Sequence, residues 1–143
     1  MDVILRQATP DDVPFLLELR EITMGEYLRN IGMPTSQEDY LRRIQYKYDC
    51  AEIITVNNQP IGLYKAEYQP NEALWYLIQI QITPQYQGQG IGYQLIHQLI
   101  QQAQKSNLRV GLSVIKTNPA LRLYKRLGFA IVDEKQYEYE LEL

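Results

Sequence analysis

An apolar run, a loop with three glycines and an amphipathic helix follow one another in the middle of the chain. The run ends at Pro84, which cannot donate to a sheet ladder, and glycines occupy positions 88, 90 and 92. Apolar residues then recur at helical spacing, at Leu95, Ile96, Leu99, Ile100 and Ala103. Because the first turn of a helix leaves backbone N–H groups unpaired and its dipole favours negative charge, we predict an anion-binding site at this loop.

Two common phosphate-binding motifs do not fit the loop. A P-loop requires a lysine and then a serine or threonine at its end, whereas Tyr93 and Gln94 follow Gly92. A dinucleotide-binding loop requires the spacing G-x-G-x-x-G and an acidic residue at the end of the next strand. The glycines here follow the spacing G-x-G-x-G, and the run 109–112 carries no acid. Both alternatives are therefore weak.

A second motif lies downstream of the loop. The loop itself, 87–92, follows the pattern Gln/Arg-x-x-Gly-x-Gly/Ala, and the segment 118–129 contains Asn118, Tyr124 and a Gly-Phe pair at 128–129. In these two motifs the chain resembles the GNAT superfamily of acetyl-CoA-dependent N-acetyltransferases. One alanine departs from the family's second pattern, because Ala120 follows Asn118 by two residues instead of three. The order of the expected elements also follows the family's, so the resemblance covers essentially the whole chain.

The patterning predicts seven strands and four helices. The expected strands cover 3–8, 51–56, 61–68, 73–82, 109–115, 129–132 and 136–143. The expected helices begin at Pro10, after Ser36, after the glycine loop and at Pro119. This gives the order β-α-α-β-β-β-α-β-α-β-β in a single domain over residues 1–143, an α/β (α+β) fold. The resemblance implies a mixed, mostly antiparallel central sheet flanked by helices.

The resemblance implies acetyl-CoA as co-substrate. Backbone amides from Gly88 to Tyr93 would take the pyrophosphate, and the strand before the loop would offer backbone groups to the pantetheine arm. That strand would also splay from the strand 110–114 to leave a slot for the arm. The residues implied to contact the coenzyme are Ile80, Ile82, Thr83, Gln87, Gly88, Gln89, Gly90, Ile91, Gly92, Tyr93 and Asn118. Asn118 is equally well explained as a helix cap, and the two roles are compatible.

By the same resemblance, an amine attacks the thioester directly in a ternary complex, and Tyr124 lies near the coenzyme sulfur as catalytic residue. The alternative for Tyr124 is an ordinary core tyrosine. Cys50 is expected to be a small buried residue, and His97 is expected to be a surface residue. Some family members carry a glutamate base on the fourth strand, but Gln79 and Gln81 occupy the comparable positions here. Either a water relays the proton to a more distant carboxylate, for which Glu26, Glu67 and Glu72 are candidates, or the amine arrives neutral. Each of these three carboxylates is better explained as a surface charge.

The acceptor is expected to be a primary amine of a small molecule or a peptide. By the resemblance, its site would be formed by 24–48 and 133–139, which are rich in tyrosines and acids. Such a surface suits a cationic amine, although amphipathic helix faces explain the same pattern. Members of this set are Glu26, Tyr27, Glu38, Asp39, Tyr40, Tyr46 and Tyr48.

The composition of the chain argues against some classes of binding partner. The net charge of -3 and the lack of a lysine- or arginine-rich run argue against nucleic acid as a partner. No apolar run reaches transmembrane length, the N-terminus lacks a signal-peptide pattern, and there is one cysteine, so we expect a cytoplasmic protein without membrane contact. No metal is expected. The alternating final strand could pair two copies into a homodimer. The alternatives to an enzyme are a non-catalytic acetyl-CoA-binding regulatory module and an interaction domain.

Overall fold

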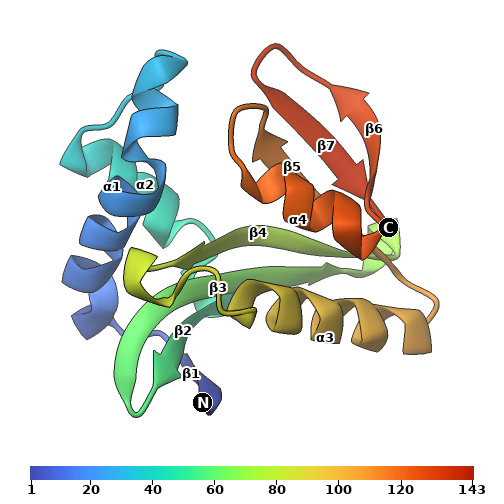
Figure 1. Cartoon of the computed structure of the whole chain (residues 1–143), viewed down its shortest axis with the longest axis horizontal. Helices are drawn as coiled ribbons and strands as arrows, with labels where there is room; N and C mark the ends of the chain where they lie inside the picture. Colours follow the sequence, from blue (N-terminus) through green and yellow to red (C-terminus); the bar gives the residue numbers. More distant parts are fainter. The chain divides into compact units, whose positions relative to one another are not determined.

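The computed structural model describes all residues, Met1–Leu143, and Figure 1 labels its elements. The strands are β1 (Val3–Gln7), β2 (Ala51–Val56), β3 (Gln59–Gln69), β4 (Leu74–Ile82), β5 (Arg109–Ile115), β6 (Ala130–Glu134) and β7 (Glu138–Glu142). The α-helices are α1 (Val13–Asn30), α2 (Gln37–Gln45), α3 (Ile91–Lys105) and α4 (Ala120–Leu127). Four short 3-10 turns are η1 (Pro10–Asp12), η2 (Tyr48–Cys50), η3 (Pro70–Glu72) and η4 (Pro84–Tyr86). The order of strands and α-helices confirms the predicted one.

The seven strands are hydrogen-bonded in the order β1-β2-β3-β4-β5-β7-β6. β4 and β5 run parallel, whereas β1–β2, β2–β3, β5–β7 and β6–β7 are antiparallel pairs. The predicted fold class, a mostly antiparallel sheet flanked by helices, is therefore confirmed. Contacts divide the chain into two compact units, Met1–Lys65 with Gln79–Ile91 and Ala66–Ile78 with Gly92–Leu143. The single domain over 1–143 stays a prediction.

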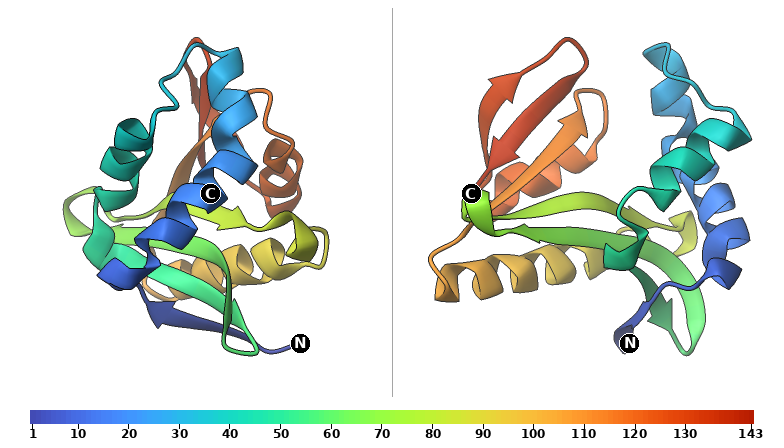
Figure 2. Two further views of the ribbon diagram at one scale, coloured as in Figure 1. Left: turned by 90° about the vertical axis from the view of Figure 1, so that its left-hand side faces the viewer. Right: turned by 180° about the vertical axis from the view of Figure 1, so that it is seen from behind.

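In the first unit, α1 and α2 lie side by side (Figure 2) and pack against one face of β2 and β3. Residues at alternate positions of the strands meet apolar residues of both helices, as the two-residue period of a strand requires. The buried cluster consists of Ala8, Leu16, Leu19, Ile44, Ala51, Ile53 and Leu63. Burial of this cluster is the main force that holds α1 and α2 on the sheet.

Both helix starts predicted in the first unit are present. Thr9 and Asp12 form a capping box around η1, which leads directly into α1. The Ser36 side chain accepts a hydrogen bond from the backbone N–H of Asp39 at the start of α2, with an N···O distance of 3.2 Å. These caps satisfy backbone donors that the first turn of a helix leaves unpaired, so local sequence fixes where the helices begin.

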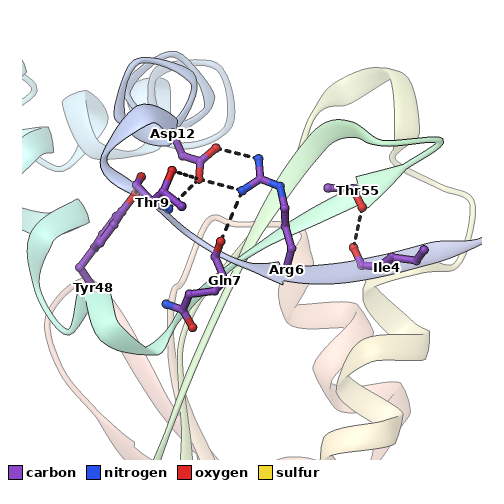
Figure 3. Close-up of polar contacts among 7 residues, drawn as sticks. All are labelled: Ile4, Arg6, Gln7, Thr9, Asp12, Tyr48 and Thr55. Carbon is purple, nitrogen blue, oxygen red and sulfur yellow. Dashed lines mark hydrogen bonds and ion pairs between the residues drawn. The ribbon is translucent and has the colours of Figure 1, made fainter.

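Asp12 also joins the start of α1 to β1 (Figure 3). Its two carboxylate oxygens accept hydrogen bonds from Nη1 and Nη2 of Arg6, at 2.9 and 2.8 Å, and Oδ2 accepts one from the Thr9 N–H at 2.8 Å. The bonds from Arg6 hold the pKa of the Asp12 carboxyl below its ordinary value, against the opposing effect of burial. The same figure shows Tyr48 donating to the carbonyl oxygen of Thr9 at 2.7 Å.

Replacing Asp12 with asparagine is expected to lower the free energy of unfolding by about 1–2 kcal/mol at neutral pH, because a bidentate ionic pair is lost. The Arg6 side chain is 43% exposed, which keeps the effect modest. Since the folded pKa of Asp12 is lowered, its contribution is present above about pH 4 and disappears as the pH falls. Denaturant unfolding should therefore find the two proteins converging in stability below about pH 4. The exposed Asp11→Asn variant is the control, and a pH-independent difference would contradict this explanation.

In the second unit, β5 pairs with β4 on one side and with β7 on the other, and β6 is the edge strand beyond β7 (Figure 1). The predicted apolar face of α3 is buried, with Leu95, Ile96, Leu99, Ile100 and Ala103 at most 6% exposed. All five residues of β6 are exposed, including Ile131 and Val132. Of the alternating face predicted for the last strand, Leu141 is buried, whereas Tyr137 and Leu143 are exposed.

Several element boundaries differ from those predicted by a few residues, and α1 begins at Val13 because the segment from Pro10 to Asp12 forms a 3-10 turn. β3 begins at Gln59 and includes Pro60, which was expected to end a turn. Pro60 is accommodated because the β2–β3 register shifts between Ile54 and Thr55, and irregularities of this kind tolerate a residue without an N–H donor. α4 begins at Ala120, one residue later than predicted, and β6 runs to Glu134, two residues further than predicted.

No helix combines the length and the apolar character that crossing a membrane would require. His, Cys, Asp and Glu side chains nowhere gather in groups of three or more that could hold a metal ion. Cys50, which was expected to be buried, is only half-buried, because it lies in η2 before β2 begins.

Candidate cofactor and acyl-transfer site

The glycine loop joins the end of β4 to the start of α3 through the turn η4. Gly88 and Gly90 both have positive backbone φ angles, +75° and +82°, which side-chain-bearing residues rarely adopt. A Cβ added at either glycine would meet no atom within 4 Å. The backbone conformation therefore favours glycine at both positions, whereas no neighbouring atom of the chain would exclude a side chain there.

Two glutamine side chains stabilise the loop from within. The Gln87 side-chain amide donates to the carbonyl oxygen of Ile82 at 2.8 Å, and that of Gln89 donates to the carbonyl oxygen of Gln85 at 3.1 Å. Both side chains are thus bonded to the stem of the loop. Each side chain keeps Oε1 and a second N–H available, so the predicted contacts of Gln87 and Gln89 with a coenzyme stay predictions.

The start of α3 is where the sequence predicts an anion site, and anion binding there stays a prediction. Ile91 is buried and anchors the first turn, Gly92 is half-buried, and Tyr93 is 43% exposed. The Tyr93 ring stacks on His97, one turn further along, with 5.7 Å between ring centroids. His97 is exposed, as expected for a surface residue. The N–H groups of this first turn have no acceptors within the helix, and they carry the positive end of its dipole.

The strand before the loop uses part of its backbone for its own structure. The N–H of Thr83 donates to the carbonyl oxygen of Ile61 on β3 at 2.8 Å, and Gln87 occupies the carbonyl of Ile82. The backbone contacts predicted for Ile80, Ile82 and Thr83 with the pantetheine arm stay predictions. The parallel ladder between β4 and β5 runs from the Leu74–Arg109 pair to the Leu77–Leu112 pair. The predicted splay beyond these pairs stays a prediction.

Side chains alternate along this end of β4. Ile80 and Ile82 are half-buried, whereas Gln79 and Gln81 are buried, with 6% and 7% of their surface exposed. Neither hydrogen-bonding atom of the Gln79 amide has a partner. A glutamine cannot act as a base, as predicted, but a buried amide without partners is costly to the fold.

Lys65, on β3, is a buried cation that sequence reasoning missed. It is 0% exposed, and its Nζ donates to the carbonyl oxygens of Ile44 and Tyr46, at the end of α2, at 2.9 and 2.6 Å. The pKa of Lys65 is lowered to about 8, chiefly by burial and also by the positive charges of Arg43 and Arg20. The spacing in the sequence could have indicated its burial, because Lys65 follows Ile61 and Leu63 at alternate positions of the strand and so shares their face.

In the second unit, Tyr124 lies on α4 and is only 7% exposed. Its ring meets the edge of Phe129 with 6.0 Å between centroids, and burial raises the pKa of its hydroxyl to about 12. Tyr124 therefore remains protonated at all ordinary pH values and can donate a hydrogen bond. Asn118 caps α4, because its Oδ1 accepts from the N–H of Ala120 at 2.9 Å. The N-cap position itself is Pro119, one residue later than predicted, and the contact of Asn118 with a coenzyme stays a prediction.

The acids and tyrosines predicted for the acceptor surface are largely engaged elsewhere. The Tyr40 hydroxyl donates to Glu21 at 2.7 Å, and Asp39 forms an ion pair with Arg42 at 3.3 Å. Among the candidate bases, Glu26 and Glu72 are exposed. A carboxyl not considered from sequence is Glu140, which accepts from the Tyr76 hydroxyl at 3.3 Å and whose pKa is raised, chiefly by burial.

Comparison with known proteins identifies the class. Solved structures share the fold over the full length of the chain. An acetyltransferase from Thermus thermophilus aligns with a TM-score of 0.76 and 22% identity, over 100% of this chain and 97% of that one. The PaiA N-acetyltransferase from Thermoplasma acidophilum, in complex with coenzyme A, aligns with a TM-score of 0.74 and 17% identity, over 99% and 98% of the two chains.

The acetyltransferase (GNAT) family model matches residues 16–129, so the chain belongs to this family. A relative from Haemophilus influenzae (strain ATCC 51907 / DSM 11121 / KW20 / Rd), a [ribosomal protein bS18]-alanine N-acetyltransferase, is 37% identical over 84 residues. The match covers 58% of this chain and 56% of the relative, so it spans little more than half of that protein's length.

Proposed function

We propose that this protein transfers an acetyl group from acetyl-CoA to a primary amine of a small molecule or a peptide, by direct attack in a ternary complex. The loop carries the proposal, because Gly88 and Gly90 have positive φ angles and open surroundings directly before the start of α3, where a helix binds anions such as a pyrophosphate. Family membership and a coenzyme-A-bound structural neighbour support the choice of acetyl-CoA. The name of the Haemophilus relative supports a peptide or protein among the acceptors. We also infer a cytoplasmic location, because the name of the same relative gives a ribosomal protein as its substrate.

In this proposal the backbone of 88–93 binds the pyrophosphate, with Asn118 as a further contact, and the strand from Ile80 to Thr83 lies along the pantetheine arm. One N–H of that strand would stabilise the oxyanion that forms when the amine attacks. Tyr124 would donate a hydrogen bond to the departing sulfur. Full transfer of its proton is disfavoured, because its pKa of about 12 lies above that of a thiol, about 8.5.

Replacing Tyr124 with phenylalanine is expected to lower kcat at least about tenfold, because the leaving thiolate loses a hydrogen-bond donor. Binding of acetyl-CoA, measured by calorimetry, should change less than about twofold, because the loop is untouched. The exposed Tyr68→Phe variant is the control for loss of a hydroxyl. An unchanged kcat would refute the role of Tyr124 and leave it as a core tyrosine.

The alternative is a non-catalytic acetyl-CoA-binding regulatory or interaction module. The lack of a carboxylate at Gln79 and Gln81 keeps this alternative open. Release of free thiol from acetyl-CoA across a panel of amines separates the two, because a module would bind acetyl-CoA and release none. The final alternating strand was predicted to be the edge that pairs two copies, but this is wrong, because β7 lies between β5 and β6 in the sheet. A homodimer would have to use the edge strand β6 instead, and sedimentation in solution tests this separate proposal.

A further inference from the structure

A tyrosine on β4 and a glutamate on β7 meet across the strand that separates them. The Tyr76 hydroxyl donates to the Glu140 carboxylate, with O···O distances of 3.3 Å to Oε2 and 3.5 Å to Oε1. β5 lies between these strands, and neighbouring strands are roughly 5 Å apart, so both side chains must reach over it. Tyr76 pairs with Gly111 on β5, where an added Cβ would already lie 3.4 Å from Cδ2 of the Tyr76 ring. The contact therefore depends on a glycine that leaves room for the ring.

The Glu140 side chain points away from α4 and remains accessible. Leu141 and Leu143 are buried or half-turned positions that flank Glu142, so they lie on the other face of the sheet from Glu140. A Cβ added to Gly128, at the end of α4, would lie 3.1 Å from Leu143, which places α4 on that other face (Figure 1). The Glu140 side chain is 24% exposed. A substrate can therefore reach its carboxylate from the face that α4 does not cover.

The Tyr76–Glu140 pair lies where β4 and β5 cease to pair with each other. Their parallel ladder ends at Leu77–Leu112, and Ser113, the next residue of β5, pairs with Glu140 on β7. In the proposed function the pantetheine arm enters the slot beyond this ladder. Tyr124 of α4 then holds the sulfur from one face of the sheet, and Glu140 meets an amine that approaches from the other. The nucleophile and the leaving group are different substituents of the acyl carbon, so the two residues serve them without competing.

The groups around Glu140 suit a proton acceptor. Burial raises the pKa of its carboxyl above the ordinary value, and the like charges of Glu138 and Asp133 act in the same direction. The hydrogen bond from Tyr76 and the charge of Lys135, whose Nζ lies 3.9 Å from Oε1, oppose them. A carboxyl with a raised pKa is a stronger base, while a donor such as Tyr76 favours its charged form.

We propose that Glu140 is the base that takes a proton from the acceptor amine, and that Tyr76 holds its carboxylate toward the end of the β4–β5 ladder. The inference rests on the proposed function and names a catalytic residue for it. Glu140 touches the amine, whereas Tyr76 acts through Glu140 and is a positioning residue. Glu140 thereby supplies the proton acceptor that Gln79 and Gln81 on β4 cannot provide.

An amine that arrives as an ammonium gives up two protons in this reaction. The first passes to the Glu140 carboxylate and from there to water, which leaves the nitrogen lone pair free to form the C–N bond to the acetyl carbon. The C–S bond then breaks, and the thiolate leaves with its electron pair, stabilised by the hydrogen bond from Tyr124. The nitrogen releases the second proton to water after the attack, and this proton balances the one that the thiolate takes up.

The test follows thiol release from acetyl-CoA by the full chain with two peptides. One has a free N-terminus and no lysine, and the other has an acetylated N-terminus and one lysine. Glu140→Gln should lower kcat at pH 7 by at least about 100-fold on a lysine amine. On an N-terminal amine the loss should be about tenfold, because about a tenth of that amine is already neutral. The loss should shrink as the pH rises toward the pKa of the amine, since a neutral amine needs no base.

Glutamine keeps an acceptor for the Tyr76 hydroxyl, so the melting temperature and the acetyl-CoA affinity of Glu140→Gln should stay close to those of the wild type. Glu142→Gln is the matched control. Glu142 lies on the same strand and the same face and forms an ion pair with Arg109. Its replacement removes the same charge and should leave kcat within about twofold.

Tyr76→Phe tests the positioning role. Phenylalanine keeps the ring and removes the hydrogen bond that lowers the pKa of Glu140. The acid limb of the kcat profile should therefore move to higher pH. A merely structural role of Tyr76 would lower the melting temperature and leave this limb in place. Should Glu140→Gln fail to fold, the pH profile of Tyr76→Phe decides the inference.

Each outcome bears on the inference. A Glu140→Gln variant with the kcat of the wild type would overturn it and leave the proposed function standing. An equal loss in Glu142→Gln would also overturn it, because negative charge on this face and not a base would then matter. An acid limb that does not move in Tyr76→Phe would count against it as well. Thiol release by the wild type with neither peptide nor any amine of the panel would remove both the inference and the proposed function.

Discussion

Replacing Lys65 with methionine is expected to lower the free energy of unfolding by about 3 kcal/mol at neutral pH. The side chain is 0% exposed, and its Nζ bonds the carbonyl oxygens of Ile44 and Tyr46 at 2.9 and 2.6 Å. Methionine fills a similar volume but donates nothing, so these two carbonyls lose a donor. Each buried acceptor left unpaired costs roughly 1–3 kcal/mol. The variant no longer buries a charged group, and this gain offsets part of the cost of the two unpaired carbonyls.

The stability difference between the wild type and the Lys65→Met variant should depend on pH, because the Lys65 ammonium titrates. The pKa of Lys65 is lowered from 10.5 to about 8 in the folded protein. Between these values the unfolded chain binds more protons than the folded one, so the wild type gains stability as the pH rises through this window. The variant has no such group. Denaturant titrations at pH 8 and at about pH 10.5 should therefore give a larger stability difference at the higher pH.

Lys105→Met, at the exposed end of α3, is the matched control and should change stability by less than about 0.5 kcal/mol. A Lys65→Met variant as stable as the wild type would contradict the role of the hydrogen bonds at the end of α2. A stability difference that stays constant across the pH window would contradict the lowered pKa.

The contacts that bury Lys65 could not be predicted from the sequence. Local signals located the helices, because caps such as Ser36 and the 3.6-residue period of α3 depend on neighbours in the chain. The burial of Lys65 depends on carbonyls that lie about 20 residues away in sequence. No local pattern encodes such a contact, and a lysine is by default assigned to the surface.

Some features of the candidate site could likewise be predicted from the sequence, and others could not. The glycine spacing and the downstream motif predicted the loop, and the structure adds the φ angles that explain why Gly88 and Gly90 are glycines. The lack of a base at Gln79 was visible in the sequence. Its unpartnered amide was not, because an unsatisfied group is defined by all of its neighbours in space. The acids and tyrosines of α1 and α2 suggested an acceptor surface, but two of them, Asp39 and Tyr40, are bonded to Arg42 and Glu21.

Replacing both Gly88 and Gly90 with valine is expected to weaken acetyl-CoA binding about 100-fold. A β-branched residue avoids positive φ, at a cost of roughly 1–2 kcal/mol per position. The free variant would relax the loop into another conformation, and binding would have to restore the original one. About 3 kcal/mol in total corresponds to a factor of about 100 in Kd, which calorimetry measures directly.

Two controls distinguish loop conformation from other effects. Gly32, just beyond α1, has a φ of +76° and equally open surroundings. Gly32→Val should lower the melting temperature without affecting acetyl-CoA. Asparagine tolerates positive φ far better than valine, so the Gly88→Asn/Gly90→Asn variant should lose less than about tenfold in affinity. If the asparagine variant loses as much as the valine variant, a Cβ is excluded by the approaching phosphate and not by the backbone angle. If neither variant loses affinity, the anion does not bind at this loop, and the proposed acetyl-CoA site is wrong.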